Sequence, residues 1–387
     1  MTRVISVDAA TVKGECSKAW RKCVGSGYAY LGLREDYRRH LEIVRRECGF
    51  EYVRFHGLLH DSMGIYTEDR EGRALYNWQY LDKLYDGILD AGMRPFVEIS
   101  FMPEALASGK QPLFFWRANV TPPKSYERFG ELVYNLASHL TRRYGENEVR
   151  KWYFEIWNEP NHPAFFSGDL NDYFRLYETA ARAIKDVCPG YRVGGPASAG
   201  PQWIREIIDF CHTNRVPIDF ISTHAYAVDG VLDEFGTKLL YMSEDPGAIV
   251  NTVKQVRGWI DSSRMPELEL HYTEWSTSYS SRDPVHDSYV SAPFILSKLK
   301  RVEGLADSMS YWTFSDVFEE AGPGPGHFHG GFGLLNLQEL RKPSFFAYKF
   351  LNELGDTEIG CDDPDAFACK SDDGVQVLFW NYTCPKQ

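Results

Sequence analysis

Short apolar runs alternate with helical patterns along most of this 387-residue chain. Eight runs of strand length are predicted, at residues 23–31, 51–56, 94–101, 152–157, 191–193, 218–224, 268–275 and 308–314. A helix is predicted after each run, at residues 34–48, 80–91, 126–144, 173–187, 203–213, 246–262, 290–302 and 345–354. Continuous apolar strands are typical of parallel sheets covered by helices. Eight such units favour a closed (β/α)8 barrel, a TIM barrel, over an open doubly wound sheet.

Both ends of the chain are expected to lie outside this barrel. Residues 1–22 show no clear pattern and are interpreted as an N-terminal segment, with membership of a β-rich appendage left open. The barrel is predicted to span residues 23–355. Residues 356–387 contain a strand-like run at 374–382 and are predicted to begin a β-sandwich-like accessory domain that stops before it is complete.

The composition excludes several classes of partner. The net charge of −12, with no block of Lys and Arg to offset it, argues against nucleic acid and against an anionic membrane surface. The N-terminus lacks the apolar run of about seven or more residues that a signal peptide needs. No stretch approaches the roughly 18 apolar residues of a membrane span.

The cysteines and short motifs indicate neither a metal nor a cofactor. The eight cysteines form no CxxC pair and are interpreted as mostly reduced thiols of a cytoplasmic protein, with one local disulfide left open among Cys361, Cys369 and Cys384. His, Asp and Cys residues show no metal-ligand spacing, and no GxGxxG loop follows the first strand. We expect no metal and no cofactor.

Two of the predicted strands end in an acidic residue. Pro160 stops the run at 152–157 and leaves Asn158 and Glu159 at the carboxyl end of the strand, and the run at 268–275 ends with Glu274. Parallel α/β folds collect their chemistry at this end of their strands. Two carboxylates on two strand ends are the arrangement that a retaining glycosidase needs.

The residues around these two acids resemble a known family. Trp157-Asn-Glu-Pro160 and Thr273-Glu-Trp275 resemble the clan of retaining barrel glycosidases, whose acid/base and nucleophile lie on strands four and seven. From about Cys23 onward the chain is similar to glycoside hydrolase family 39, and within it to the bacterial β-xylosidases, more than to the α-L-iduronidase branch. The motifs that carry the similarity are His56-Gly-Leu-Leu, Gly64-Ile-Tyr, Phe101-Met-Pro-Glu-Ala-Leu-Ala-Ser-Gly, Asn119-Val-Thr-Pro-Pro-Lys, His224-Ala-Tyr, Tyr311-Trp-Thr-Phe-Ser-Asp-Val-Phe-Glu-Glu and His329-Gly-Gly-Phe-Gly-Leu.

The resemblance implies a role for each acid and for the residue beside the first. Glu159 is expected to be the general acid/base, because burial beside aromatic residues would raise its pKa. Glu274 is expected to attack the anomeric carbon as an ionised nucleophile that accepts a hydrogen bond from Tyr226 or His224. Asn158 is expected to donate to the sugar 2-hydroxyl, with an Asx turn before the proline as the competing interpretation.

The remaining candidates are expected to surround the substrate. His56, His224 and Tyr226 are predicted sugar contacts, against the alternative of a satisfied core histidine, and Trp312 is a sugar platform or a core tryptophan. One of Glu319 and Glu320 resembles the sugar-binding glutamate of the family, although adjacent loop acids are often only solvated. Phe114, Phe115 and Trp116 form an apolar run after the third strand that is predicted to wall the pocket, with Phe115 singled out as a substrate contact. Arg54 is predicted to lie beneath the site and pair with the catalytic carboxylates.

The sequence thus predicts an exo-acting, retaining β-xylosidase whose substrate is a small oligosaccharide. One alternative keeps the fold and cleaves another glycoside, and a second is a barrel that binds glycans without cleaving them. The two glutamates count against the second alternative, because a binding module needs neither of them. A homo-oligomer is left open.

Overall fold

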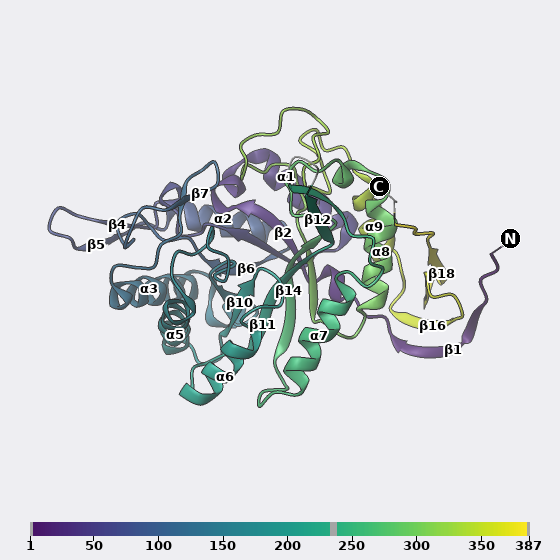
Figure 1. Ribbon diagram of the computed structural model, residues 1–387, viewed down its shortest axis with the longest axis horizontal. Coiled ribbons are helices and arrows are strands. Elements are labelled where there is room, and N and C mark those ends of the chain that lie inside the picture. The colour runs from purple at the N-terminus through teal and green to yellow at the C-terminus, as the bar shows by residue number, and fades with distance from the viewer. Residues whose placement is uncertain (1–2, 233–237, 385–387) are drawn as a thin grey trace.

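The computed structural model describes residues 3–232 and 238–384 and confirms the (β/α)8 barrel (Figure 1). Eight parallel strands close into the barrel, and each pairs with the next along the chain until the last pairs with the first. The barrel strands are β2 (Cys23–Tyr28), β3 (Tyr52–His56), β6 (Arg94–Ile99), β9 (Tyr153–Ile156), β10 (Arg192–Ser198), β11 (Phe220–Tyr226), β14 (Glu269–Ser276) and β15 (Ser308–Tyr311).

Helices surround the barrel because each buries one face against it. In α1 the buried side chains include Tyr37, Leu41 and Val44, three or four residues apart. The Ser125 hydroxyl caps α3, and Asp169 forms a capping box at the start of α5. The helices are α1 (Glu35–Cys48), α2 (Gln79–Asp90), α3 (Tyr126–Tyr144), the short α4 (Glu146–Val149), α5 (Leu170–Val187), α6 (Ile204–Asn214), α7 (Val250–Asp261), α8 (Ser291–Arg301) and α9 (Pro343–Asn352).

Strand β10 is longer than the sequence pattern predicts. The predicted run at 191–193 was expected to stop at Gly194-Gly-Pro, yet the strand continues through Ser198. A Cβ atom at Gly194 would lie 2.4 Å from the Phe220 carbonyl oxygen, and one at Gly195 would lie 2.7 Å from the Tyr173 hydroxyl. These glycines therefore permit close packing against β11 and α5 instead of ending the strand.

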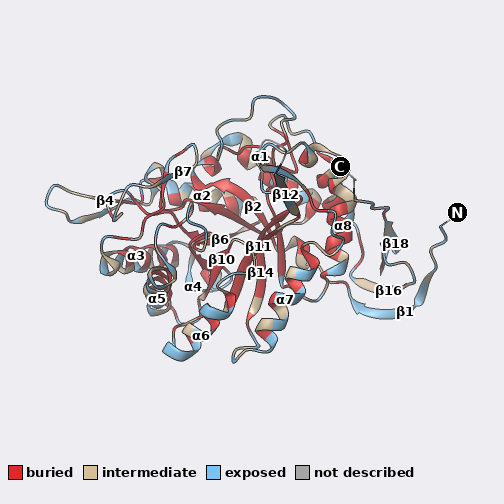
Figure 2. Cartoon of the chain, viewed as in Figure 1, coloured by how far each residue is buried: buried red, intermediate tan, exposed pale blue. Residues whose placement is uncertain are grey.

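A second sheet lies beside the barrel and contains both ends of the chain. It is antiparallel, in the order β1 (Val7–Glu15), β16 (Thr357–Cys361), β17 (Ala366–Ser371) and β18 (Gly374–Phe379). Figure 2 shows that β1 is mostly exposed, in contrast to the buried barrel strands. The N-terminal segment thus pairs with the C-terminal strands.

The segments that connect the longer strands and helices contain short hairpins and 3₁₀ turns. The hairpins are β4 (Tyr66–Glu68) with β5 (Ala74–Tyr76), β7 (Pro112–Leu113) with β8 (Ala118–Asn119), and β12 (Val228–Leu232) with β13 (Lys238–Met242). The 3₁₀ turns are η1 (Ala19–Arg21), η2 (Ala29–Leu33), η3 (Asp61–Met63) and η4 (Pro284–Asp287).

The structure also answers two questions raised by the composition. Within residues 3–232 and 238–384, none of the helices combines the length and apolar character needed to cross a bilayer. All eight cysteines are free thiols, so the local disulfide left open among Cys361, Cys369 and Cys384 is not formed. The sulfur of Cys369 instead lies 3.6 Å from that of Cys16.

Candidate active site

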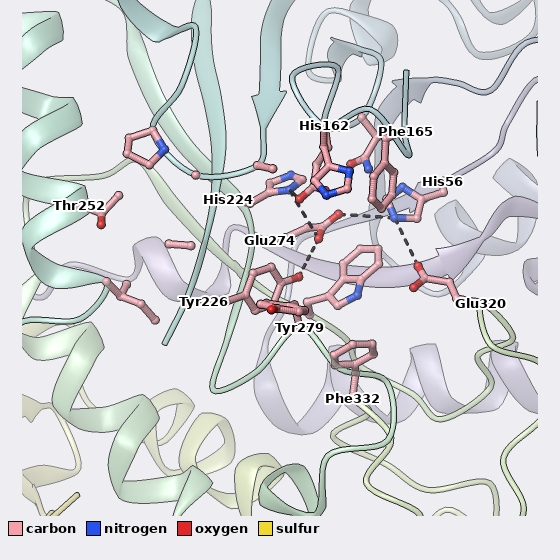
Figure 3. Close-up of a pocket in the computed structure, with 18 of the residues that line it drawn as sticks. His56, His162, Phe165, His224, Tyr226, Thr252, Glu274, Tyr279, Glu320 and Phe332 are labelled. Carbon is pink, nitrogen blue, oxygen red and sulfur yellow. Dashed lines mark hydrogen bonds and ion pairs between the residues drawn. The ribbon is translucent and has the colours of Figure 1, made fainter. Parts of the chain in front are cut away.

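A cavity of about 500 Å³ opens at the carboxyl ends of the barrel strands (Figure 3). This volume lies within the roughly 300–1,000 Å³ range of small-molecule sites. Residues from seven of the barrel strands or from the segments that follow them line it, and they include most of the predicted site residues: His56, Asn158, Glu159, His224, Tyr226, Glu274, Trp312 and Glu320.

The chain turns sharply where β9 delivers its functional residues. Trp157 and Glu159 both have left-handed backbone conformations, with φ of 74° and 46°. Such conformations cost on the order of 1–3 kcal/mol each for residues other than glycine. The surrounding barrel supports this turn, because the Glu159 amide donates to the Ala197 carbonyl at 2.8 Å and the Trp157 indole donates to the Phe165 carbonyl at 2.9 Å.

The two predicted catalytic glutamates face each other across the cavity. Glu159 follows the fourth barrel strand and Glu274 lies on the seventh, and a carboxylate oxygen of each is within 4.8 Å of the other. Both are largely buried, with 13% and 7% of their side chains exposed. Burial raises the pKa of Glu159 to about 7, so this carboxyl keeps its proton at pH values at which an ordinary glutamate is ionised.

Glu274 has a contrasting environment that stabilises negative charge. The Arg54 guanidinium donates to its Oε1 at 2.9 Å, and the Tyr226 hydroxyl donates to its Oε2 at 2.7 Å. The Glu159 carboxyl is therefore placed to hold a proton and the Glu274 carboxylate to carry charge. These are the different environments expected of a general acid and a nucleophile.

Arg54 forms the floor beneath the cavity and is fully buried. It lies 2.8 Å from Glu98, 2.5 Å from Glu155 and 2.9 Å from Glu274, and it donates to the Asn158 side-chain oxygen at 2.8 Å. Burial opposes the charge on Arg54, but these carboxylates outweigh that cost and raise its pKa. The guanidinium thereby fixes the side chain of Glu274 and that of Asn158, the neighbour of Glu159.

The expected pairing of Arg54 with both catalytic carboxylates is wrong in one respect, because its recorded ion pairs include Glu274 and not Glu159. Its other partners, Glu98 and Glu155, were not predicted. A charged residue within an apolar strand run, as at Glu155, was the signal that could have indicated a buried partner for the arginine.

The pKa values of the two histidines shift in opposite directions. Burial lowers the pKa of His224 to about 4, so its ring is neutral at neutral pH, and its Nδ1 lies 2.8 Å from Glu159 Oε1. The same atom is 3.6 Å from Glu274, so Tyr226 is the hydroxyl donor to Glu274 and His224 contacts Glu159. His56 is also buried, which opposes its charge, but Glu98 at 2.8 Å outweighs this and raises its pKa.

The structure distinguishes the two adjacent glutamates after β15. Glu320 lines the cavity, with Oε1 3.6 Å from His56 Nε2, and burial raises its pKa to about 8. A protonated Glu320 can donate a hydrogen bond to a sugar hydroxyl. Glu319 accepts from the partly exposed Arg34 guanidinium at 3.0 Å and is not among the cavity-lining residues.

Phe115 does not wall the cavity, contrary to the prediction. Its side chain is 64% exposed, whereas the neighbouring Phe114 lines the cavity. The left-handed backbone of Phe114, with φ of 61°, turns the loop so that consecutive rings face different ways. The backbone of Phe115 still contributes, because its amide donates to the Glu320 carbonyl at 2.7 Å.

Trp312 lines the cavity and is only 2% exposed. Its ring lies 4.8 Å from that of His56 and edge-on to that of Phe318 at 6.0 Å. Sequence reasoning missed several other residues of the lining, although Phe332 belonged to a motif already singled out. These residues are His162, Phe165, Ala199, Gly200, Pro201, Ile249, Thr252, Tyr279 and Phe332.

Among the described residues, one group of three could offer ligand atoms to a metal ion, namely Glu159, His224 and Glu274. Arg54 and Tyr226 already donate to the two oxygens of Glu274. A guanidinium thus supplies positive charge beside this carboxylate, and the proximity of the three groups fits an acid and a nucleophile acting on one bond.

A closed barrel with two facing glutamates on its fourth and seventh strands has the architecture of a barrel glycoside hydrolase. The chain belongs to glycoside hydrolase family 39, because the family model described as "Glycosyl hydrolases family 39" matches residues 3–382. This finding confirms the resemblance drawn from the sequence motifs.

Similar proteins include curated and solved β-xylosidases. The chain is 44% identical over 378 residues to a protein of Geobacillus stearothermophilus named "Beta-xylosidase", with 95% of this chain and 75% of that protein covered. A protein of Caldicellulosiruptor saccharolyticus with the same name is 44% identical over 381 residues, covering 96% and 77%. The crystal structure of a monomeric beta-xylosidase from Caulobacter crescentus CB15 superposes with a TM-score of 0.96 at 44% identity, covering 100% of this chain and 78% of that one.

Proposed function

We propose that this chain is an exo-acting β-xylosidase that releases xylose from small xylo-oligosaccharides with retention of anomeric configuration. The approach of a Glu159 oxygen to a Glu274 oxygen within 4.8 Å carries the mechanistic part of this proposal. Retaining glycosidases hold their carboxyl groups about 5–5.5 Å apart, whereas inverting enzymes leave about 6.5–9.5 Å for a water molecule. The 44% identical relatives named "Beta-xylosidase" support the choice of sugar.

The reaction proceeds in two displacements. Glu274 attacks the anomeric carbon while Glu159 gives its proton to the glycosidic oxygen, so that the bond to the leaving group breaks and a glycosyl–Glu274 ester forms. Glu159, now ionised, then removes a proton from water, and the water oxygen attacks the anomeric carbon and releases Glu274. Each displacement inverts the anomeric carbon, so the product retains the original configuration.

Surrounding residues prepare this chemistry. Arg54 and Tyr226 hold the nucleophile by donating to its two oxygens. Arg54 also donates to the side-chain oxygen of Asn158, which leaves the Asn158 amide group free to donate to the sugar 2-hydroxyl. That hydrogen bond strengthens as charge develops at the anomeric carbon.

The preference for xylose is expected to come from crowding around C5, where glucose carries an additional hydroxymethyl group. The loop after β15 brings Glu320 and Phe332 to the cavity, and Phe114 takes the place that had been expected for Phe115. A missing methylene contact is worth only about 1–3 kcal/mol, and a steric wall rejects more strongly. We expect aryl β-xyloside to be favoured over aryl β-glucoside by at least about 100-fold in kcat/KM.

A panel of nitrophenyl glycosides, with the first-formed anomer observed by proton NMR, tests this proposal. Preferred cleavage of the β-xyloside with β-xylose appearing first is the expected result. Comparable rates on the glucoside would remove the xylosidase assignment, and α-xylose appearing first would refute the retaining mechanism. No turnover of any glycoside, with sugar binding intact, would favour a glycan-binding barrel.

A further inference from the structure

We propose that Lys342 is a positioning residue that holds the Phe332 wall of the cavity in place and thereby limits the size of the sugar ring that fits. This inference rests on the proposed function, because it concerns how the site discriminates between xylosides and larger glycosides.

Lys342 joins three segments that follow the seventh and eighth barrel strands. Its ammonium group lies 2.7 Å from Asp287 at the end of η4 and 2.6 Å from Asp316 in the loop after β15. It also donates to the carbonyl oxygen of Gly331 at 2.8 Å. Lys342 itself is only 1% exposed and directly precedes α9.

The two acids bound by Lys342 also hold the backbone on either side of Phe332. Asp287 accepts from the Gly330 amide at 2.6 Å, and Asp316 accepts from the Gly333 amide at 2.7 Å. Together with the bond from Lys342 to the Gly331 carbonyl, these contacts secure the peptide groups that flank the Phe332 ring.

The immediate surroundings of Phe332 are equally well defined. Its ring lines the cavity (Figure 3) and is 2% exposed. It packs edge-on against Phe318 at 5.2 Å. The His286 ring lies 4.9 Å from it, and His286 Nδ1 is 2.8 Å from the Gly330 carbonyl oxygen. A side chain at Gly331 would meet Asp316 Oδ1 at 2.4 Å, so this close approach requires glycine.

The ion pairs of Lys342 with Asp287 and Asp316 are better suited to holding Phe332 in place than to stabilising the fold. A buried ion pair is a weak source of net stability, because desolvation of the charges offsets much of their attraction. A buried ion pair is better suited to fixing geometry, and here its contacts hold the backbone of Gly330, Gly331 and Gly333, which flank one cavity-lining ring. Displacement of that ring would enlarge the cavity beside Trp312, with which Phe332 forms one buried cluster.

A double-mutant cycle tests this proposal through the ratio of kcat/KM for 4-nitrophenyl β-xyloside and β-glucoside. Lys342→Met and Phe332→Ala are each expected to lower this ratio by about 10-fold or more. Adding Lys342→Met to Phe332→Ala is expected to cause no further change, because the lysine acts through the ring. A loss of stability alone would not produce this non-additivity.

Two further variants make the cycle decisive. Lys298→Met is the matched control, because Lys298 is 2% exposed and bonds the Pro246 carbonyl, and neither residue lines the cavity. Its ratio should stay at the wild-type value. Asp287→Asn removes one charge at a side chain that is 15% exposed, and should lower the ratio about threefold even if Lys342→Met does not fold.

The outcomes separate this proposal from the one on which it rests. Wild-type protein without xylosidase activity would overturn both. An active xylosidase whose ratio is unchanged in Lys342→Met and Asp287→Asn would overturn the positioning role alone. Equal effects of these substitutions with and without the Phe332 side chain would show that they do not act through the ring.

Discussion

The dependence of activity on pH should reveal the proton held by Glu159. Burial raises the pKa of this carboxyl from 4.5 to about 7, which corresponds to about 3 kcal/mol in favour of the protonated form. At pH 7 about half of the molecules then carry the proton, whereas a carboxyl of ordinary pKa would be well under about 1% protonated. The structure thus supplies roughly a 100-fold gain in the acid form at neutral pH.

The sign of the effect follows from the role of the proton. Only protonated Glu159 can assist departure of a poor leaving group, so kcat/KM for phenyl β-xyloside should fall about tenfold for each pH unit above about 7. A 2,4-dinitrophenyl leaving group needs no proton, and its profile should lack this basic limb. The assay is initial-rate kinetics with both substrates from about pH 5 to about pH 9.

A second buried carboxyl provides the control. Burial raises the pKa of Glu320 to about 8, so its ionisation could add to the basic limb. Glu320→Gln removes that ionisation and should leave the limb near pH 7, whereas Glu159→Gln should abolish the limb near pH 7. Identical basic limbs near pH 7 for the two leaving groups, or a limb near pH 7 that persists in Glu159→Gln, would refute the reasoning.

Three other predictions follow from the site. Glu274→Ala should lower activity by about 10⁴-fold or more on every substrate, and azide should then give an inverted product, whereas azide added to Glu159→Ala should give a product of retained configuration, both identified by NMR. Arg54→Leu should reduce the free energy of unfolding in urea by about 3–5 kcal/mol, because it leaves buried carboxylates without their partner, and a loss below about 1 kcal/mol would contradict this. Phe114→Ala should lower kcat/KM for aryl β-xyloside about 10-fold and Phe115→Ala by less than about twofold, and the reverse order would show that the assignment of the wall is wrong.

The barrel could be predicted because its strands are buried on both faces and read as apolar runs. The same rule placed Asn158 and Glu159 at one strand end and Glu274 on another. It failed at Gly194 and Gly195, where the missing side chains accommodate Phe220 of β11 and Tyr173 of α5. Such close approaches depend on residues that are distant in the chain, so the local pattern does not reveal them.

The loops were harder to predict because neighbouring residues of the same type point in different directions. Glu319 and Glu320 have the same chemistry, and only the position of Arg34 shows which one faces away from the cavity. Phe114 and Phe115 are equally apolar, yet a left-handed backbone at the first determines which ring reaches the site. These differences arise from tertiary contacts and from backbone conformations that the residue types do not specify.

Trapping the glycosyl-enzyme is the most direct test of the proposed mechanism. A 2-deoxy-2-fluoro-β-xyloside with an activated leaving group slows the second displacement, so the intermediate should accumulate and add the mass of one fluoroxylosyl group to the protein. Peptide mapping by mass spectrometry should place this label on Glu274, and Glu274→Ala should remain unlabelled. A label on another residue, or an active enzyme that forms no adduct and releases an inverted product, would contradict the account.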